Sequence, residues 1–194
     1  MNAPRRVDCG AMILIVAGVS GSGKTTVGAL LAARLHWPFD DGDAFHPAAN
    51  IAKMEAGIPL TDEDREPWLR ALAAWMDDRI ARGQSEVLAC SALKRAYRDE
   101  LLGGRPEARM IFLSEDREEV AQHLAGRHGH FFPAKLLDTQ FAALEPPQPD
   151  ESAVIVVDNR GDAADAVAAI LAIVCPGEGA DQGADQGQSH EADA

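Results

Sequence analysis

The fold of this 194-residue chain is predicted by residues 12–25, MILIVAGVSGSGKT. The first six, MILIVA, form a continuous apolar run, which is typical of a short strand buried on both faces of a parallel sheet. The next eight, Gly18 to Thr25, match the pattern G-x-x-x-x-G-K-[ST] of a phosphate-binding loop. Apolar residues at helical spacing follow as far as Leu35. The order strand, glycine-rich loop, helix is the one that such a loop requires.

The chemistry of phosphate binding explains these residue types. Glycines allow main-chain N–H groups to turn toward phosphate oxygens, and a helix that begins near Lys24 adds the positive end of its dipole. The Lys24 ammonium is expected to reach the β- and γ-phosphates, and the Thr25 hydroxyl to bind Mg²⁺. We expect the loop as a whole to bind ATP: Gly18, Val19, Ser20, Gly21, Ser22, Gly23, Lys24, Thr25 and Thr26.

Apolar runs and helical patterns alternate along the rest of the chain. Further strands are expected to end near residue 40 and to span 87–90, 109–113 and 154–157. Helices are expected at 46–55, from about 61 to 80, after the strand at 87–90 as far as residue 102, at 118–127 and at 163–174. This alternation predicts a three-layer α/β fold, with one five-stranded parallel sheet and helices on both faces. Because ligands of such sheets bind beyond the carboxyl ends of the strands, the residues after each strand are the candidate site.

The helix expected from residue 61 carries two signals. Thr61-Asp-Glu-Asp64 is a capping-box pattern, and Pro67 is compatible with it if the helix begins a few residues later. Five apolar residues share one helical face, which predicts core packing: Trp68, Leu72, Trp75, Met76 and Ile80.

The chain is acidic, with 31 Asp and Glu against 18 Lys and Arg and a formal net charge of −13. This charge disfavours nucleic acids and anionic membranes as partners. Residues 176–194 contain five of the acids, no Lys or Arg and a repeated Gly-Ala-Asp-Gln, so they are expected to form a disordered tail. Residues 1–10 are expected to be a flexible N-terminus.

Three cysteines, Cys9, Cys90 and Cys175, are too few and too scattered to predict a disulfide framework or a zinc site. Cys90 is expected to be a small core residue. The apolar run at 11–19 is too short for a full signal-peptide pattern or a membrane span. These features together predict a cytoplasmic protein.

Charged side chains follow the second and third strands. Asp41 and Asp43 flank a glycine, so one carboxylate could orient or deprotonate an attacking hydroxyl while the other organises Mg²⁺ through water. Lys94 and Arg98 are four residues apart, and therefore share one face of a helix near its start. Cations there oppose the helix dipole, a placement that an anion between them would explain; a solvated basic face is an equal alternative.

Five segments in order along the chain resemble gluconokinase of the small, thermoresistant P-loop type. They are GVSGSGKTT (18–26), DGDAFHPAANIAKMEAGIPLTDEDREPWL (41–69), CSALKRAYRDEL (90–101), GRHGHFFP (126–133) and QFAALEPP (140–147). The resemblance runs from about residue 12 to 174, and the second segment is long and distinctive. It implies the fold of nucleotide and shikimate kinases, with a kinase domain over residues 11–175 and a short helical lid at about 127–140.

The resemblance also implies a reaction. It is the Mg²⁺-dependent transfer of the ATP γ-phosphate to the 6-hydroxyl of D-gluconate, giving 6-phospho-D-gluconate and ADP for carbohydrate acid catabolism. The resemblance further suggests a homodimer.

Gluconate has one carboxylate and several hydroxyls, so its pocket requires cations and hydrogen-bonding groups. The cations expected for the carboxylate are Arg65, Lys94 and Arg98. The residues expected for the hydroxyls are Asp43, His46 and Tyr97. Asp41 is expected to orient the attacking hydroxyl, and Asp43 fits that role nearly as well. Arg65 has an alternative, an ion pair with an acid of its own helix.

Three residues are expected to be catalytic: Lys24, Asp41 and Arg127. Arg127 begins the lid segment and would neutralise charge on the transferred phosphoryl group; its alternative is a helix C-terminal cation. His128 stands where gluconokinases often have Lys. The resemblance implies that Asp158 and Asn159, after the fifth strand, lie near the adenine; a surface loop is the equal alternative.

Other functions fit less well. Shikimate and adenylylsulfate kinases are the alternatives within small-molecule P-loop kinases, but the block at 41–69 argues against each. A switch GTPase would be expected to show an N-K-x-D-like segment, which this sequence lacks. A non-catalytic ATP-binding module would be expected to have lost Lys24 or the acidic pair.

Overall fold

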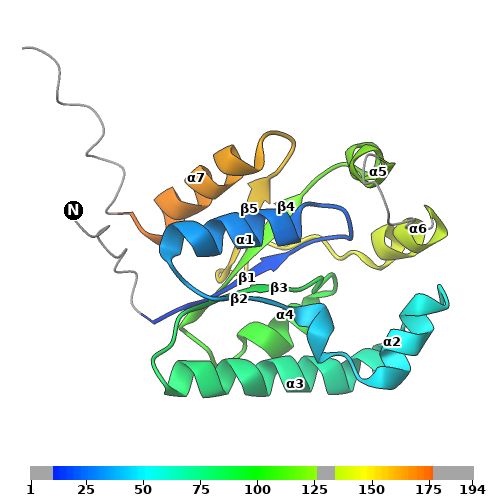
Figure 1. Ribbon diagram of the computed structural model, residues 1–194, viewed down its shortest axis with the longest axis horizontal. Coiled ribbons are helices and arrows are strands. Elements are labelled where there is room, and N and C mark those ends of the chain that lie inside the picture. The colour runs from blue at the N-terminus through cyan, green and yellow to red at the C-terminus, as the bar shows by residue number, and fades with distance from the viewer. Residues whose placement is uncertain (1–10, 126–133, 177–194) are drawn as a thin grey trace, which may run out of the picture.

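Five parallel strands form one sheet in the order β2-β3-β1-β4-β5 in the computed structural model, which describes residues 11–125 and 134–176 (Figure 1). The strands are β1 (Ile13–Ala17), β2 (Phe39–Asp41), β3 (Glu86–Ala89), β4 (Ala108–Ser114) and β5 (Val154–Asp158). All four neighbouring pairs are parallel. The predicted five-stranded parallel sheet is therefore confirmed.

Helices cover both faces of the sheet, as Figure 1 shows. On one face lie α1 (Lys24–Leu35) and α7 (Ala163–Val174), and on the other α3 (Asp62–Ala81) and α4 (Arg95–Leu102). Three further helices, α2 (Ala48–Glu55), α5 (Arg117–Ala125) and α6 (Ala134–Ala143), lie toward the carboxyl ends of the strands. This arrangement is the predicted three-layer α/β fold.

The central strand β1 is buried along its whole length, so its residues contribute to both cores. Leu14 and Val16 pack with α1 and α7, whereas Ile13, Ile15 and Ala17 pack with α3 and α4. Successive side chains of a strand point to opposite faces, which is why an uninterrupted apolar run is required here. Burial on both faces fixes the point at which β1 ends and the phosphate loop begins.

Helix α3 begins with the predicted capping box. The Asp64 N–H donates to the Thr61 hydroxyl at 3.3 Å, and the Thr61 N–H donates to the Asp64 carboxylate at 3.0 Å. Trp68, Leu72 and Met76 are buried in one core, with Trp75 and Ile80 packed against it, so the predicted apolar stripe is confirmed. The later start expected because of Pro67 is wrong, since the helix begins at Asp62 and includes this proline.

The helix expected at 46–55 begins two residues later, at Ala48. A short 3₁₀ helix, η1 (Gly42–Phe45), follows β2, and His46 is then extended with φ −66° and ψ 136°. Pro47 explains this, because proline sterically disfavours the helical conformation in the residue before it. His46 is thereby held outside the regular helix, between η1 and α2.

Cys90 is buried and free, as predicted, whereas Cys175 at the end of α7 is disulfide-bonded. The cysteine spacing did not predict this disulfide at Cys175. No helix in the described ranges is both long and apolar enough to cross a membrane. The expected N-terminus, the expected tail beyond residue 176 and the lid residues Arg127 and His128 lie outside the described residues.

Candidate active site

The phosphate loop leaves the centre of the sheet with three glycines in conformations that other residues rarely adopt. Gly18, Gly21 and Gly23 have φ values of 143°, 91° and 82°. A Cβ on Gly18 would lie 2.7 Å from the Ser22 hydroxyl, and one on Gly23 would lie 2.9 Å from the Asn159 amide nitrogen. These positions therefore require glycine for both backbone conformation and space.

Lys24 begins α1 and closes the loop on itself. Its ammonium donates to the Val19 carbonyl at 2.9 Å, and the Ser22 N–H donates to the same oxygen at 3.2 Å. Gly23 is the N-cap of α1 and provides no side-chain acceptor for the first turn. The start of the helix thus faces the loop with its positive dipole end, as anion binding requires.

Asn159, which follows β5 at the edge of the sheet, supports the phosphate loop. It is buried, and its amide nitrogen donates to the Ser22 carbonyl at 2.9 Å and to Glu115 at 2.8 Å. The sequence allowed two interpretations of Asn159, a position near the adenine or a surface loop. In the structure Asn159 is buried and hydrogen-bonded to the phosphate loop. Its place after a strand was the signal, but its partners are distant in sequence.

The acidic turn after β2, residues 41–43, is held by a hydrogen bond from Trp68 of α3. The indole N–H donates to the Gly42 carbonyl at 2.7 Å. Asp41 is the N-cap of η1 and accepts from the Asp43 N–H at 3.0 Å. Gly42 is packed so closely against β3 that a Cβ would lie 2.7 Å from the Ala89 carbonyl oxygen. Position and orientation of the turn are therefore fixed by α3 and β3 together.

The two carboxylates of this turn lie within electrostatic reach of the phosphate loop. Surrounding protein raises the pKa of Asp43, the Asp41 carboxylate raises it further, and the Lys24 ammonium opposes both effects. The Asp43 side chain remains 72% exposed, so it is accessible to a ligand. Lys24, Asp41 and Asp43, which follow different strands of the sheet, are thus within electrostatic reach of one another.

His46 is buried beside the same turn. Its ring stacks on Trp68 with centroids 4.4 Å apart and planes inclined by 14°. The Asn50 side-chain amide donates to Nδ1 at 3.3 Å, so Nε2 carries the proton and points toward the Asp43 carboxylate, 3.9 Å away. Burial, assisted by the charge of Arg65, lowers the pKa of His46 to about 4. The ring is therefore a neutral donor near pH 7.

Three of the residues expected to bind gluconate gather around one carboxylate, that of Asp62. The Lys94 ammonium donates to both Asp62 oxygens at 2.7 Å, and the Tyr97 hydroxyl donates to one of them. Lys94 and Arg65 lie 5.7 and 5.9 Å from the centroid of the Tyr97 ring. The Arg65 guanidinium also donates to the Leu60 carbonyl. This cluster therefore already binds a carboxylate, although one from the chain itself.

Asp62 was missed by sequence reasoning. It lies in the distinctive block and its side chain is 57% exposed at the first position of α3, where an acid stabilises the helix dipole. Hydrogen bonds from Lys94 and Tyr97 hold the pKa of this carboxyl below its usual range. An acid at the start of a helix is already explained by the helix dipole. The sequence therefore gave no reason to expect that Asp62 pairs with Lys94 and Tyr97, 32 and 35 residues away.

Comparison with known proteins agrees with this geometry. The model of the family described as shikimate kinase matches residues 20–174. A gluconokinase of Gluconobacter oxydans is 48% identical over 147 residues, 76% of this chain and 83% of that protein. The thermoresistant gluconokinase of Escherichia coli is 42% identical over 168 residues, 86% of this chain and 95% of its own length.

Solved structures show the same relationship. A gluconokinase from Sinorhizobium meliloti is 42% identical and superimposes with a TM-score of 0.77, covering 89% of this chain and 94% of that one. The chain belongs to the gluconokinase family. A shikimate kinase from Bacteroides thetaiotaomicron is only 18% identical, with a TM-score of 0.60 over 84% of this chain and 98% of its own, and shows the shared fold alone.

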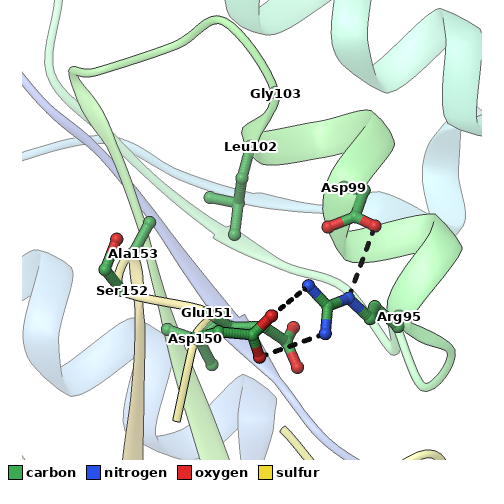
Figure 2. Close-up of a pocket in the computed structure, with 9 residues that line it drawn as sticks. Arg95, Asp99, Leu102, Gly103, Asp150, Glu151, Ser152 and Ala153 are labelled. Carbon is green, nitrogen blue, oxygen red and sulfur yellow. Dashed lines mark hydrogen bonds and ion pairs between the residues drawn. The ribbon is translucent and has the colours of Figure 1, made fainter. Parts of the chain in front are cut away.

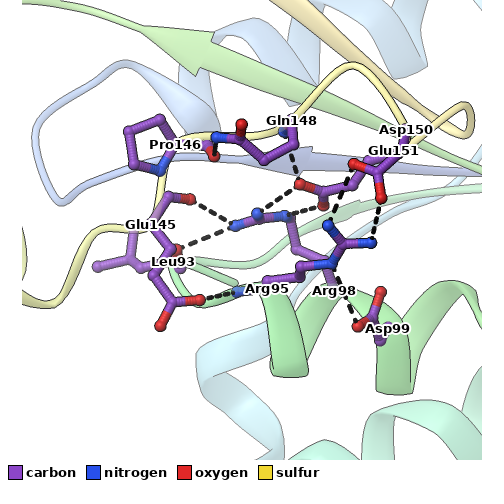
Figure 3. Close-up of polar contacts among 9 residues, drawn as sticks. All are labelled: Leu93, Arg95, Arg98, Asp99, Glu145, Pro146, Gln148, Asp150 and Glu151. Carbon is purple, nitrogen blue, oxygen red and sulfur yellow. Dashed lines mark hydrogen bonds and ion pairs between the residues drawn. The ribbon is translucent and has the colours of Figure 1, made fainter.

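Arg98 does not lie where the gluconokinase resemblance led us to expect it. Its guanidinium, 1% exposed, donates to both oxygens of buried Glu151 at 2.6 and 2.9 Å and to the Leu93 and Glu145 carbonyls at 3.0 Å (Figure 3). These bonds connect α4 with the segment before β5. The structure therefore gives Arg98 a structural role, because burial turns its donors toward the protein and away from a carboxylate ligand.

A shallow pocket of about 230 Å³ lies beside this ion pair (Figure 2). Arg95 at its rim donates to both oxygens of Asp150 and lies 3.7 Å from Asp99. The lining contains none of the predicted ATP or gluconate residues: Arg95, Asp99, Leu102, Gly103, Asp150, Glu151, Ser152, Ala153 and Val154. We assign the candidate active site instead to the edge where the strands end.

Removal of Arg98 tests its structural role. Arg98→Met leaves the Glu151 carboxylate buried without its partner, so we expect the free energy of unfolding, measured with urea, to fall by about 3–5 kcal/mol. The double variant Arg98→Met/Glu151→Leu should recover much of this loss. As a control, Arg70→Met breaks an exposed pair with Glu66 and should cost less than about 1 kcal/mol. An undiminished stability with a selectively raised KM for gluconate would return Arg98 to the substrate site.

The pKa of His46 predicts a dependence of stability on pH. This pKa is about 4 in the folded protein against 6.5 for an unperturbed histidine, so the unfolded chain takes up the proton first. Its contribution to stability is therefore complete above pH 6.5 and is lost as the pH falls toward 4. Between pH 6.5 and 4, we expect the free energy of unfolding of His46→Gln, measured with urea at successive pH values, to fall less than that of the parent protein. Exposed His36, replaced by Asn, is the control, and an unchanged slope for His46→Gln would contradict the assignment.

Proposed function

We propose that this protein phosphorylates D-gluconate at the 6-hydroxyl with ATP, giving 6-phospho-D-gluconate and ADP. The observation that supports this most is the cluster of Arg65, Lys94 and Tyr97, in which Lys94 and Tyr97 bind the Asp62 carboxylate and Arg65 lies within electrostatic reach of His46 beside the acidic turn. A sugar acid has the carboxylate that such a cluster recognises and a distant hydroxyl that can accept phosphate. The family relationship supports the same substrate.

In this proposal each part of the cleft has one task. The loop from Gly18 to Thr26 binds the triphosphate through main-chain N–H groups, and Lys24 exchanges the Val19 carbonyl for phosphate oxygens. Asp41 or Asp43 orients the attacking hydroxyl and accepts its proton. His46, neutral with its proton on Nε2, donates a hydrogen bond to a gluconate hydroxyl. Arg65, Lys94 and Tyr97 bind the carboxylate after it displaces Asp62.

Magnesium fits the residues of this cleft. Hydroxyl and carboxylate oxygens are the protein ligands that Mg²⁺ prefers, and Thr25 and the acidic turn provide them. The described ranges contain no group of three or more His, Cys, Asp or Glu side chains placed to hold a metal, which suits an ion that is bound chiefly by nucleotide phosphates and water. When bound, Mg²⁺ would neutralise charge developing on the phosphates. Arg127 would add a further positive charge.

We further propose a cytoplasmic homodimer that binds neither nucleic acid nor membranes. The net charge of −13 supports the exclusion of nucleic acids and anionic membranes, the family resemblance supports a homodimer, and the short apolar run at 11–19 supports a cytoplasmic location.

A coupled assay for ADP release tests the reaction directly. With a panel of D-gluconate, other sugar acids, shikimate and adenylylsulfate, we expect turnover with gluconate. Lys24→Ala should reduce kcat by at least about 100-fold without loss of folded structure, because it removes only the phosphate clamp. Activity confined to shikimate or adenylylsulfate would exclude the proposed substrate.

The two acids of the turn can be ordered by matched substitutions. Asp41→Asn and Asp43→Asn each remove one charge, and the variant lacking the acceptor of the hydroxyl proton should lose about 100- to 10,000-fold in kcat. The other variant should change chiefly KM. We expect Asp41→Asn to be the more damaging for kcat. Equal, small effects of both variants on kcat would show that neither accepts the proton.

A further inference from the structure

The phosphate loop has a second support, from α6, whose residues 134–140 fall in the expected lid segment. Gln140 of α6 accepts a hydrogen bond from the Ser20 N–H through Oε1 at 2.6 Å. Its Nε2 donates to the Ser20 hydroxyl at 2.8 Å. One side chain therefore engages both the main chain and the side chain of a residue 120 positions earlier in sequence.

Apolar packing holds α6 in the same place. Leu137 is buried with Val19, Leu93 and Val120, and Phe141 packs against this small core. Residues 137, 140 and 141 are spaced three and four apart, so they lie on one face of the helix. This face contacts two consecutive residues of the loop, Val19 and Ser20. Gln140 is thus directed at the loop by packing as well as by its own hydrogen bonds.

The bonded N–H belongs to a peptide unit that also determines the position of Lys24. The Val19–Ser20 peptide presents its N–H to Gln140 and its carbonyl to the Lys24 ammonium at 2.9 Å. A peptide group is planar, so fixing the direction of its N–H fixes the direction of its carbonyl. Ser20 lies between Gly18 and Gly21, whose freedom would otherwise allow this plane to rotate.

We propose that Gln140 is a positioning residue for phosphoryl transfer. Gln140 orients the Val19–Ser20 peptide, and the Val19 carbonyl of that peptide then holds the Lys24 ammonium against the phosphate loop. The loop then binds the triphosphate with less ordering cost, because its shape is set before ATP arrives. The effect on catalysis rests on the proposed function, whereas the effect on ATP binding does not.

The test is a Gln140→Met variant, which keeps the length and packing of the side chain and loses both hydrogen bonds. Without any acceptor substrate, we expect the Kd for Mg·ATP by calorimetry to rise about 10-fold. In the gluconate assay kcat should fall while KM for gluconate stays within about 2-fold. Ser20→Ala removes only the bond to the hydroxyl and should have a smaller effect on Kd.

Asp138→Ala is the matched control on the same helix. Asp138 pairs with Arg117 on the exposed side of α6, so its loss should leave ATP binding unchanged. An ATP Kd within 2-fold of the parent for Gln140→Met would overturn the proposal. So would equal losses in ATP and gluconate binding with a lowered Tm, or the same loss in Asp138→Ala. If the parent fails to phosphorylate gluconate but Gln140→Met weakens ATP binding, the proposed substrate is wrong and the positioning role stands.

Discussion

Burial of β1 on both faces is the constraint on which the active-site edge depends. A strand inside a parallel sheet is covered by helices on either side, and its chain can leave only at the end. In this protein the chain leaves β1 directly into three glycines with positive φ and then into α1. The apolar core fixes where the loop starts, and the packing of α1 fixes where it stops. The position of the phosphate loop is therefore a consequence of how the core packs around β1 and α1.

The polar residues of the cleft are supported by contacts that lie beneath them. Trp68 is the clearest example, since one indole donates to the acidic turn, stacks on His46 and completes the core under α3. Asn159 and Gln140 have the same relation to the phosphate loop, one from β5 and the other from α6. A cleft for two flexible anions gains from such supports, because groups that are already oriented pay less entropy on binding.

The basic side chains of this acidic protein differ in their partners and in their burial. An acidic protein binds anions by collecting a few cations at one edge and pairing others internally. Lys94 pairs with the exposed Asp62 carboxylate and lies with Arg65 beside the Tyr97 ring, whereas Arg98 is paired with Glu151 in the interior. A buried ion pair is costly to form and more costly to break, so it suits a junction between elements better than an exchangeable ligand site.

The sequence by itself determined the sheet, the phosphate loop, the capping box of α3 and the family, because these depend on local patterns: apolar runs, glycine spacing and long contiguous motifs. It also predicted that Lys24, Asp41 and Asp43 would lie where ligands bind, since parallel strands end at one edge. Only the tertiary structure decided which cations face the cleft. Lys94 is the N-cap of α4 and not part of the helix as predicted, whereas Arg98 lies within it. Lys94 pairs with the exposed Asp62, 32 residues earlier, and Arg98 pairs with Glu151, 53 residues later, in the interior. Such pairings arise from packing between distant segments, so spacing along the chain could not reveal them.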